Sequence, residues 1–109
     1  MVVLIENNKC VAKVETSTIL FVEKDGRKLH VVTDSREYSY YEKLSNIEHL
    51  FDSTFFQCRK GCYINLNRVT IMEDQCVFFD NGMTYWLGRD SYIKTKHAYV
   101  SYLKKISAG

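Results

Sequence analysis

Hydrophobic residues along the chain occur in short segments of about four to six residues, separated by polar and turn-forming residues. These segments are rich in Val, Ile, Phe and Tyr, which favour the pleated backbone of a β-strand. The pattern predicts small antiparallel sheets. We expect strands at residues 11–14, 19–23, 29–33, 37–41, 55–59, 63–66, 69–72, 76–79 and 84–87.

Turn signals separate neighbouring segments. Asp25-Gly26 lies between residues 19–23 and 29–33, and Asn81-Gly82 lies between the last two segments. Gly supplies the positive φ that a two-residue hairpin turn requires. Lys60-Gly61 and the polar residues 73–75 separate two further pairs. We therefore expect each half of the chain to form a meander of neighbouring strands.

Two segments have helical periodicity instead. Leu44, Ile47, Leu50 and Phe51 recur at helical spacing and predict a helix of about two turns that lies across a sheet. The second segment starts near Asp90 and continues to the end of the chain. Its predicted buried stripe consists of Tyr92, Tyr99, Val100, Leu103 and Ile106.

The start of the second helix determines where one basic side chain lies. Asp90 or Ser91 is a suitable N-cap, and an acidic residue stabilises the positive end of a helix. This assignment leaves Arg89 at the end of the preceding strand, with its side chain directed outward.

A chain of 109 residues accommodates one modest hydrophobic core, so residues 1–109 are expected to form a single domain. No apolar run approaches the roughly 20 residues that span a bilayer. The first residues lack the basic region of a signal peptide. These features predict a cytoplasmic protein without a membrane partner. We separately expect no small-molecule substrate.

The charge of the chain is unevenly distributed. Residues 1–54 hold seven Lys and Arg against nine Asp and Glu, whereas residues 55–109 hold eight against four. The first half therefore has a net charge of −2 and the second half +4. A polyanion would bind the second half more favourably.

The four cysteines, Cys10, Cys58, Cys62 and Cys76, include no C-x-x-C pair. Cys58 and Cys62 are close in sequence, but no second matching pair completes a zinc site. We therefore interpret the cysteines as small buried residues and expect neither a metal nor another cofactor.

Catalytic patterns are also missing from the sequence. His30, His49 and His97 lie far apart and none is spaced with a nucleophile or a paired carboxylate, so we do not expect an enzyme. A redox sensor is an alternative, because Arg59 and Lys60 next to Cys58 would lower the pKa of its thiol. Burial of Cys58 would cancel that reactivity.

Three basic turns are the candidate binding elements: Arg27-Lys28, Arg59-Lys60, and Arg89 after Gly88. Strand-end loops can enter a DNA groove, where Arg contacts guanine bidentately and Lys contacts guanine or phosphate. For each turn alone, an ordinary solvated loop is the favoured interpretation. A β module that binds protein or RNA through the same turns is the second alternative.

The order of motifs resembles the LytTR family of DNA-binding domains. Residues 55–69, FFQCRKGCYINLNRV, resemble the family's Phe-rich strand, basic tip and following strand that ends in Asn. Residues 19–23 resemble its strand ending in Glu, and residues 81–82 with 87–89 resemble its closing motif. The resemblance covers about residues 9–106.

This resemblance implies an elongated set of small antiparallel β-sheets with short helices, with strand-end loops that enter successive DNA grooves. The corresponding positions are Arg27 or Lys28, Arg59 with Lys60, and Arg89. Arg59 replaces a common His, which keeps a phosphate donor. The resemblance also implies a bacterial transcription regulator, either the output domain of a two-component response regulator or a short stand-alone protein. Its partners would be double-stranded DNA and a receiver domain or second copy on repeated half-sites.

Structural roles are expected for the remaining notable residues of this region. The amide of Asn65 is suited to hold the backbone of the neighbouring turn by hydrogen bonding. Aromatic residues of the predicted strands are expected in the core or on sheet faces, namely Phe55, Phe56, Phe78, Tyr85 and Trp86.

Overall fold

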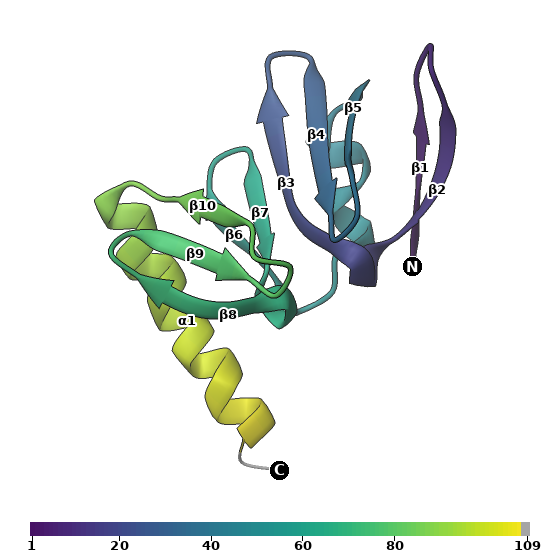
Figure 1. Ribbon diagram of the computed structural model, residues 1–109. Helices are drawn as coiled ribbons and strands as arrows, with labels where there is room; N and C mark the ends of the chain where they lie inside the picture. The colour runs from purple at the N-terminus through teal and green to yellow at the C-terminus, as the bar shows by residue number, and fades with distance from the viewer. Residues whose placement is uncertain (108–109) are drawn as a thin grey trace.

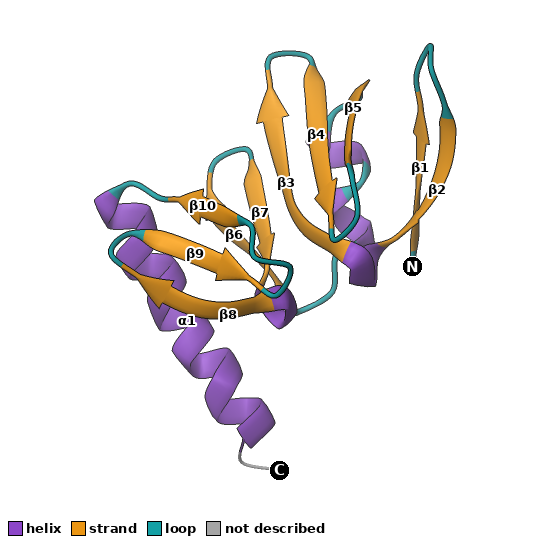
Figure 2. Ribbon diagram, viewed as in Figure 1, coloured by secondary structure: helices purple, strands orange, loops and turns teal. Residues whose placement is uncertain are grey.

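A computed structural model describes residues 1–107 of the chain. The fold is mostly β, with small antiparallel sheets and one C-terminal α-helix (Figures 1 and 2). The strands are β1 (Val2–Glu6), β2 (Val11–Glu15), β3 (Ile19–Asp25), β4 (Lys28–Thr33), β5 (Glu37–Tyr41), β6 (Phe55–Arg59), β7 (Cys62–Asn65), β8 (Val69–Glu73), β9 (Cys76–Phe79) and β10 (Thr84–Trp86). The helix α1 spans Arg89–Ser107.

A five-stranded sheet in the order β5-β4-β3-β7-β6 forms the centre of the fold. The antiparallel pairing of β3 with β7 joins the two predicted meanders, with Phe21 opposite Ile64 and Glu23 opposite Cys62. A three-stranded sheet, β10-β9-β8, and the β1-β2 hairpin complete the β structure. Local turn signals do not specify the β3-β7 pairing, so it could not be predicted from the hairpin motifs.

The central sheet is covered on both faces, which explains the continuous apolar run at the start of β3. All four residues 19–22 are buried, and a register irregularity occurs between Ile19 and Phe21. Leu20 and Phe21 belong to one hydrophobic cluster, while Ile19 and Val22 belong to the other. A run of this kind is typical of a strand that packs on both sides.

The first cluster lies between the central sheet, the three-stranded sheet and α1; it includes Phe21, Ile64, Phe79, Leu87 and Tyr99. The second cluster lies between the opposite face of the central sheet, the β1-β2 hairpin and the short helices after β5. The strand β1 was not predicted, yet its Val3 and Ile5 are almost fully buried in the second cluster.

The predicted mid-chain helix of about two turns is helical as expected, but it is not one continuous helix. The segment forms two single turns of 3₁₀-helix, η2 (Leu44–Asn46) and η3 (Glu48–Leu50). Their bonds span three residues: the Ile47 N–H donates to the Leu44 carbonyl at 3.0 Å, and the Leu50 N–H to the Ile47 carbonyl at 2.9 Å. Short segments favour 3₁₀ turns because a longer helix is needed to offset the cost of nucleation. As expected, apolar residues of this segment pack on the sheet.

The predicted buried stripe of α1 was right for Tyr99, only partly right for Tyr92, which is half-buried, and wrong for three other residues. Val100, Leu103 and Ile106 are exposed, whereas Thr95 is fully buried and Tyr102 half-buried. The hydroxyl of Tyr99 donates to the Val69 carbonyl at 2.7 Å, and that of Tyr102 to Asn67 Oδ1 at 2.6 Å. These tyrosine hydrogen bonds turn the Tyr99 side of the helix toward β8.

The start of α1 also differs from the prediction. The Tyr92 N–H donates to the carbonyl of Gly88 at 2.8 Å, so Gly88 caps the helix. Arg89 is therefore the first helical residue and not the last residue of a strand. Asp90 lies in the first turn, where its charge is favourable.

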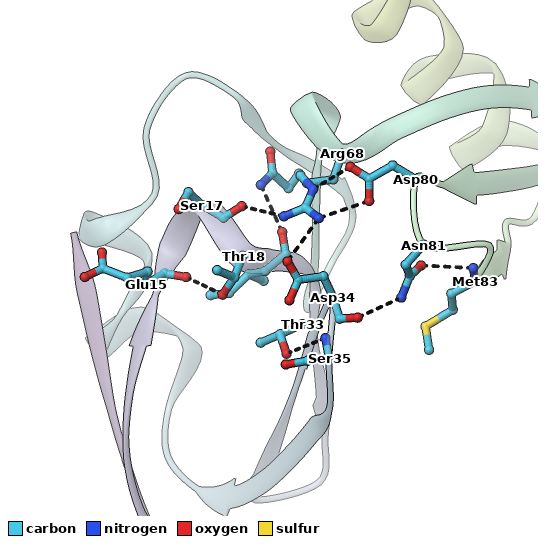
Figure 3. A network of polar contacts seen from close by, with 12 residues as sticks. Glu15, Ser17, Thr18, Thr33, Asp34, Ser35, Arg68, Asp80, Asn81 and Met83 are labelled. Atoms are coloured by element: carbon cyan, nitrogen blue, oxygen red, sulfur yellow. Dashed lines mark hydrogen bonds and ion pairs between the residues drawn. The ribbon is translucent and has the colours of Figure 1, made fainter.

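Arg68 connects the central sheet to the three-stranded sheet through polar contacts with the residues that follow β4 and β9 (Figure 3). Its guanidinium donates twice to Asp80, at 2.7 and 3.0 Å, to Asp34 at 3.1 Å, and to the Ser17 carbonyl at 2.9 Å. Asp34 follows β4, and Asp80 follows β9. These bonds join the β4-β5 turn to the β9-β10 turn, and so fix the relative position of strands that carry the basic turns at their other ends.

Candidate nucleic-acid interface

The first basic turn connects β3 to β4. Gly26 has a φ of 62°, as a tight two-residue hairpin requires, and Arg27 follows it at the exposed tip. Lys28 is the first residue of β4 and its ammonium lies 5.1 Å from the centre of the Tyr41 ring. Arg27 and Lys28 are thus presented by a rigid hairpin.

The second basic turn connects β6 to β7 and lies beside the first. Gly61 has a φ of 83°, and its carbonyl accepts a hydrogen bond of 2.7 Å from the Lys24 N–H. Lys60 is exposed at the tip. A Cβ at position 61 would approach the Lys24 Cβ to 3.3 Å, so Gly suits both the turn and the contact.

Arg59, in contrast, is directed toward the protein. Its Nη2 atom forms an ion pair with Glu23 and also donates a hydrogen bond of 2.7 Å to the Tyr85 hydroxyl. The guanidinium is therefore not free in solvent at the tip of the turn. The Tyr85 hydroxyl donates to the same Glu23 oxygen at 2.7 Å. The expected phosphate donor is therefore bound within the domain. This cluster was not predicted from the sequence, because Tyr85 was assigned to the core or a sheet face and Glu23 only to a strand motif.

The third basic position is the start of α1. Arg89 is exposed, and none of the hydrogen bonds or ion pairs formed by residues 1–107 involves its side chain. Leu87 is anchored below it: its N–H donates to the Gln75 carbonyl at 2.8 Å, and its carbonyl accepts from Gln75 Nε2 at 3.0 Å. These bonds fix the backbone just before Arg89, which lies at the N-terminal, positive end of α1.

The three positions follow one another along one edge of the molecule, from the β3-β4 turn past the β6-β7 turn to the start of α1 (Figure 1). The contact from Lys24 to Gly61 joins the first two, and the contact from Arg59 to Tyr85 joins the second to β10, which leads into α1. The structure therefore places all five predicted residues on neighbouring elements.

The family model of the LytTr DNA-binding domain matches residues 9–106. The chain belongs to this family. Among solved structures, the LytTR chain is similar to the LytTr DNA-binding domain of a protein from Bacillus cereus, described as a methyl-accepting/DNA response regulator. The TM-score is 0.68 at 18% sequence identity, covering 99% of this chain and 97% of the other. No curated protein matches the sequence.

The environment of Cys58, the thiol on which the redox alternative rests, does not favour that alternative in this LytTR domain. Cys58 and Cys62 are fully buried, and Cys58 Sγ lies 3.6 Å from the Cys62 carbonyl. The hydrogen bond to Cys62 and burial raise the pKa of the Cys58 thiol, despite the neighbouring Arg59. Cys58 is thus a protonated, poorly accessible thiol.

Residues 1–107 contain neither a cluster of metal-ligating side chains nor a helix that could span a membrane. No group of three His, Cys, Asp or Glu side chains in this part of the chain is arranged to hold a metal ion. The one α-helix within residues 1–107, α1, is not apolar enough to cross a membrane.

Proposed function

We propose that the whole chain, residues 1–109, acts as one domain that recognises specific sequences in double-stranded DNA through its basic strand-end turns. The observation that carries this proposal is the order of the β3-β4 turn, the β6-β7 turn and the start of α1 along one edge, with backbones held by hydrogen bonds. These elements bear Arg27, Lys28, Lys60 and Arg89. Rigid turns preserve the spacing of the cations, and fixed spacing is needed to match successive grooves.

The proposed cellular role is transcription regulation in the cytoplasm of a bacterium. The domain would act as the output of a two-component response regulator or as a short stand-alone regulator. A receiver domain, or a second copy on a repeated half-site, would be its partner. The similarity to a domain from a protein described as a response regulator supports the first form.

The five basic residues have different proposed roles. Arg89 is placed to contact a base edge, since its side chain is exposed at a backbone that Gly88 allows to approach DNA closely. Lys60, Arg27 and Lys28 are placed to contact phosphates or guanine. Arg59 contributes through the position of its turn, because its guanidinium is held by Glu23 and Tyr85.

Selection of binding sites from a random duplex pool tests the proposal, followed by titration of variants on the selected site and on random DNA. We expect Arg89→Ala to weaken the free energy of binding by about 1–3 kcal/mol on the selected site and by much less on random DNA. Lys60→Ala should weaken binding to both kinds of DNA. It should also reduce the salt slope, the slope of the logarithm of the binding constant against the logarithm of salt concentration, by about one.

Lys104→Ala removes the same charge near the other end of α1 and is the matched control. Thermal unfolding of each variant shows whether it is folded. Enrichment of no sequence would contradict specific recognition, and unchanged affinity of folded Arg89→Ala would remove Arg89 from the interface. A preference for RNA, or for no nucleic acid, would favour the interaction-module alternative.

A further inference from the structure

Glu23, Arg59 and Tyr85 form a polar cluster directly behind the second basic turn. One carboxylate oxygen of Glu23 accepts from both Arg59 Nη2 and the Tyr85 hydroxyl, and Arg59 Nη2 also donates to that hydroxyl. Each residue comes from a different strand: β3, β6 and β10. The cluster therefore joins the central sheet, the three-stranded sheet and the tip that bears Lys60.

The position of Glu23 on the central strand favours its ion pair with Arg59. Glu23 lies opposite Cys62 on β7 and His30 on β4, so its backbone is fixed from both sides. Its side chain is only 29% exposed, and the ring of Tyr85 packs against Phe21, two residues earlier on β3. A carboxylate in such a place is costly to leave unpaired, which favours continued contact with Arg59.

Arg59 could otherwise serve as a DNA contact, because its side chain is still 40% exposed at the edge that bears the tips. A free cation in this place would pair with any phosphate, whatever the base sequence, and release counterions. The carboxylate of Glu23 competes with phosphate for the same guanidinium. The second basic turn therefore offers random DNA one available cation, Lys60, instead of both Lys60 and Arg59.

We propose that Glu23 is a specificity determinant of the interface, which holds Arg59 and keeps its charge from contributing to sequence-independent phosphate binding. This inference rests on the proposed DNA-binding function. Tyr85 is a positioning residue in the same cluster, since its hydroxyl bonds to both charged partners. The ratio of specific to random affinity is the property that Glu23 controls.

Glu23→Gln tests the inference, since the amide keeps an acceptor oxygen for Tyr85 but removes the charge that retains Arg59. We expect the affinity for random duplex to rise about fivefold at 0.1 M salt and the salt slope to steepen by about one, as for one added phosphate contact. Affinity for the selected site should rise less, so the specificity ratio falls. The measurements are fluorescence anisotropy titrations at several salt concentrations.

Glu37→Gln is the matched control, because it removes one carboxylate at the end of β5 away from the tips. The double variant Glu23→Gln/Arg59→Gln should lose the gain, since the gain requires Arg59. Tyr85→Phe changes no charge, and we expect it to raise random-duplex affinity about twofold by loosening Arg59. It also keeps the test available should Glu23→Gln fail to fold, which thermal unfolding would show.

Two results would overturn the inference. One is a folded Glu23→Gln whose random-duplex affinity and salt slope match those of Glu37→Gln. The other is a gain that persists in the double variant. Both leave the proposed function intact if the wild-type domain still prefers its selected site. Loss of that preference in the wild type would instead contradict the proposed function.

Discussion

Asn65 shows how one buried polar side chain holds the turn after β7. It is 2% exposed, its Nδ2 donates to the Ile19 carbonyl at 2.9 Å, and its Oδ1 accepts from the Asn67 N–H at 3.1 Å. The first bond reaches back to β3 and the second caps the η4 turn (Leu66–Arg68). The predicted backbone-holding role of Asn65 is therefore confirmed.

We predict that Asn65→Ala lowers the free energy of unfolding by about 1–3 kcal/mol, because it leaves the buried Ile19 carbonyl without its donor. Asn65→Asp should cost more, since a carboxylate cannot donate to that carbonyl and its charge would be buried. Urea unfolding measures both. Asn8→Ala, at an exposed position in the β1-β2 turn, is the control. Equal stability of Asn65→Ala and wild type would contradict this role.

Single residues also mark the limit of prediction for the candidate site. The exposure of Arg27, Lys28, Lys60 and Arg89 was predictable, since the neighbouring Gly residues mark turns in the sequence. The inward position of Arg59 was not, because its partner Glu23 lies 36 residues away on another strand. Contacts of such sequence separation depend on the β3-β7 pairing, which no local motif encodes.

At the scale of elements, local patterns predicted the strands and hairpins well and helix contacts less well. The alternation of residues and the turn glycines are local properties, so the strands from β2 to β10 lie close to their predicted positions. The face of α1 that is buried depends on partners from β8 and η4, and these polar tyrosine contacts outweighed the simple apolar stripe. The strand β1 was missed.

The two faces of α1 make this difference measurable. We predict that Tyr99→Phe lowers the free energy of unfolding by about 1–2 kcal/mol, because the buried Val69 carbonyl loses the hydroxyl that donates to it. Val100→Ala, at a position that is 41% exposed, should change it by no more than about 0.5 kcal/mol. Chemical denaturation of the two variants checks this. A larger loss of unfolding free energy for Val100→Ala than for Tyr99→Phe would instead support the buried stripe predicted from the sequence.

At the scale of the whole molecule, the dimensions bear on how much DNA one domain can contact. The Cα trace extends over 42 × 30 × 25 Å, and 42 Å corresponds to about 12 base pairs of duplex at 3.4 Å each. A helical turn of DNA measures roughly 34–36 Å. With its long axis along the duplex, one domain would extend over about one turn, a length compatible with the proposed use of two copies on repeated half-sites.

We predict that two copies of the domain joined by a flexible linker bind a duplex with two half-sites about 10²–10⁴-fold more tightly than one copy binds one half-site. The second binding event becomes intramolecular, and its effective concentration is set by the linker. A duplex with one half-site scrambled is the control, and it should return the affinity to that of a single copy.

Adding five base pairs between the half-sites rotates the second half-site by about half a turn of the duplex. This should weaken binding by the fused pair, provided that the linker is short. Equal affinity for the intact and scrambled duplexes would contradict recognition of repeated half-sites, while the affinity of one copy for one site would still measure the DNA-binding function itself.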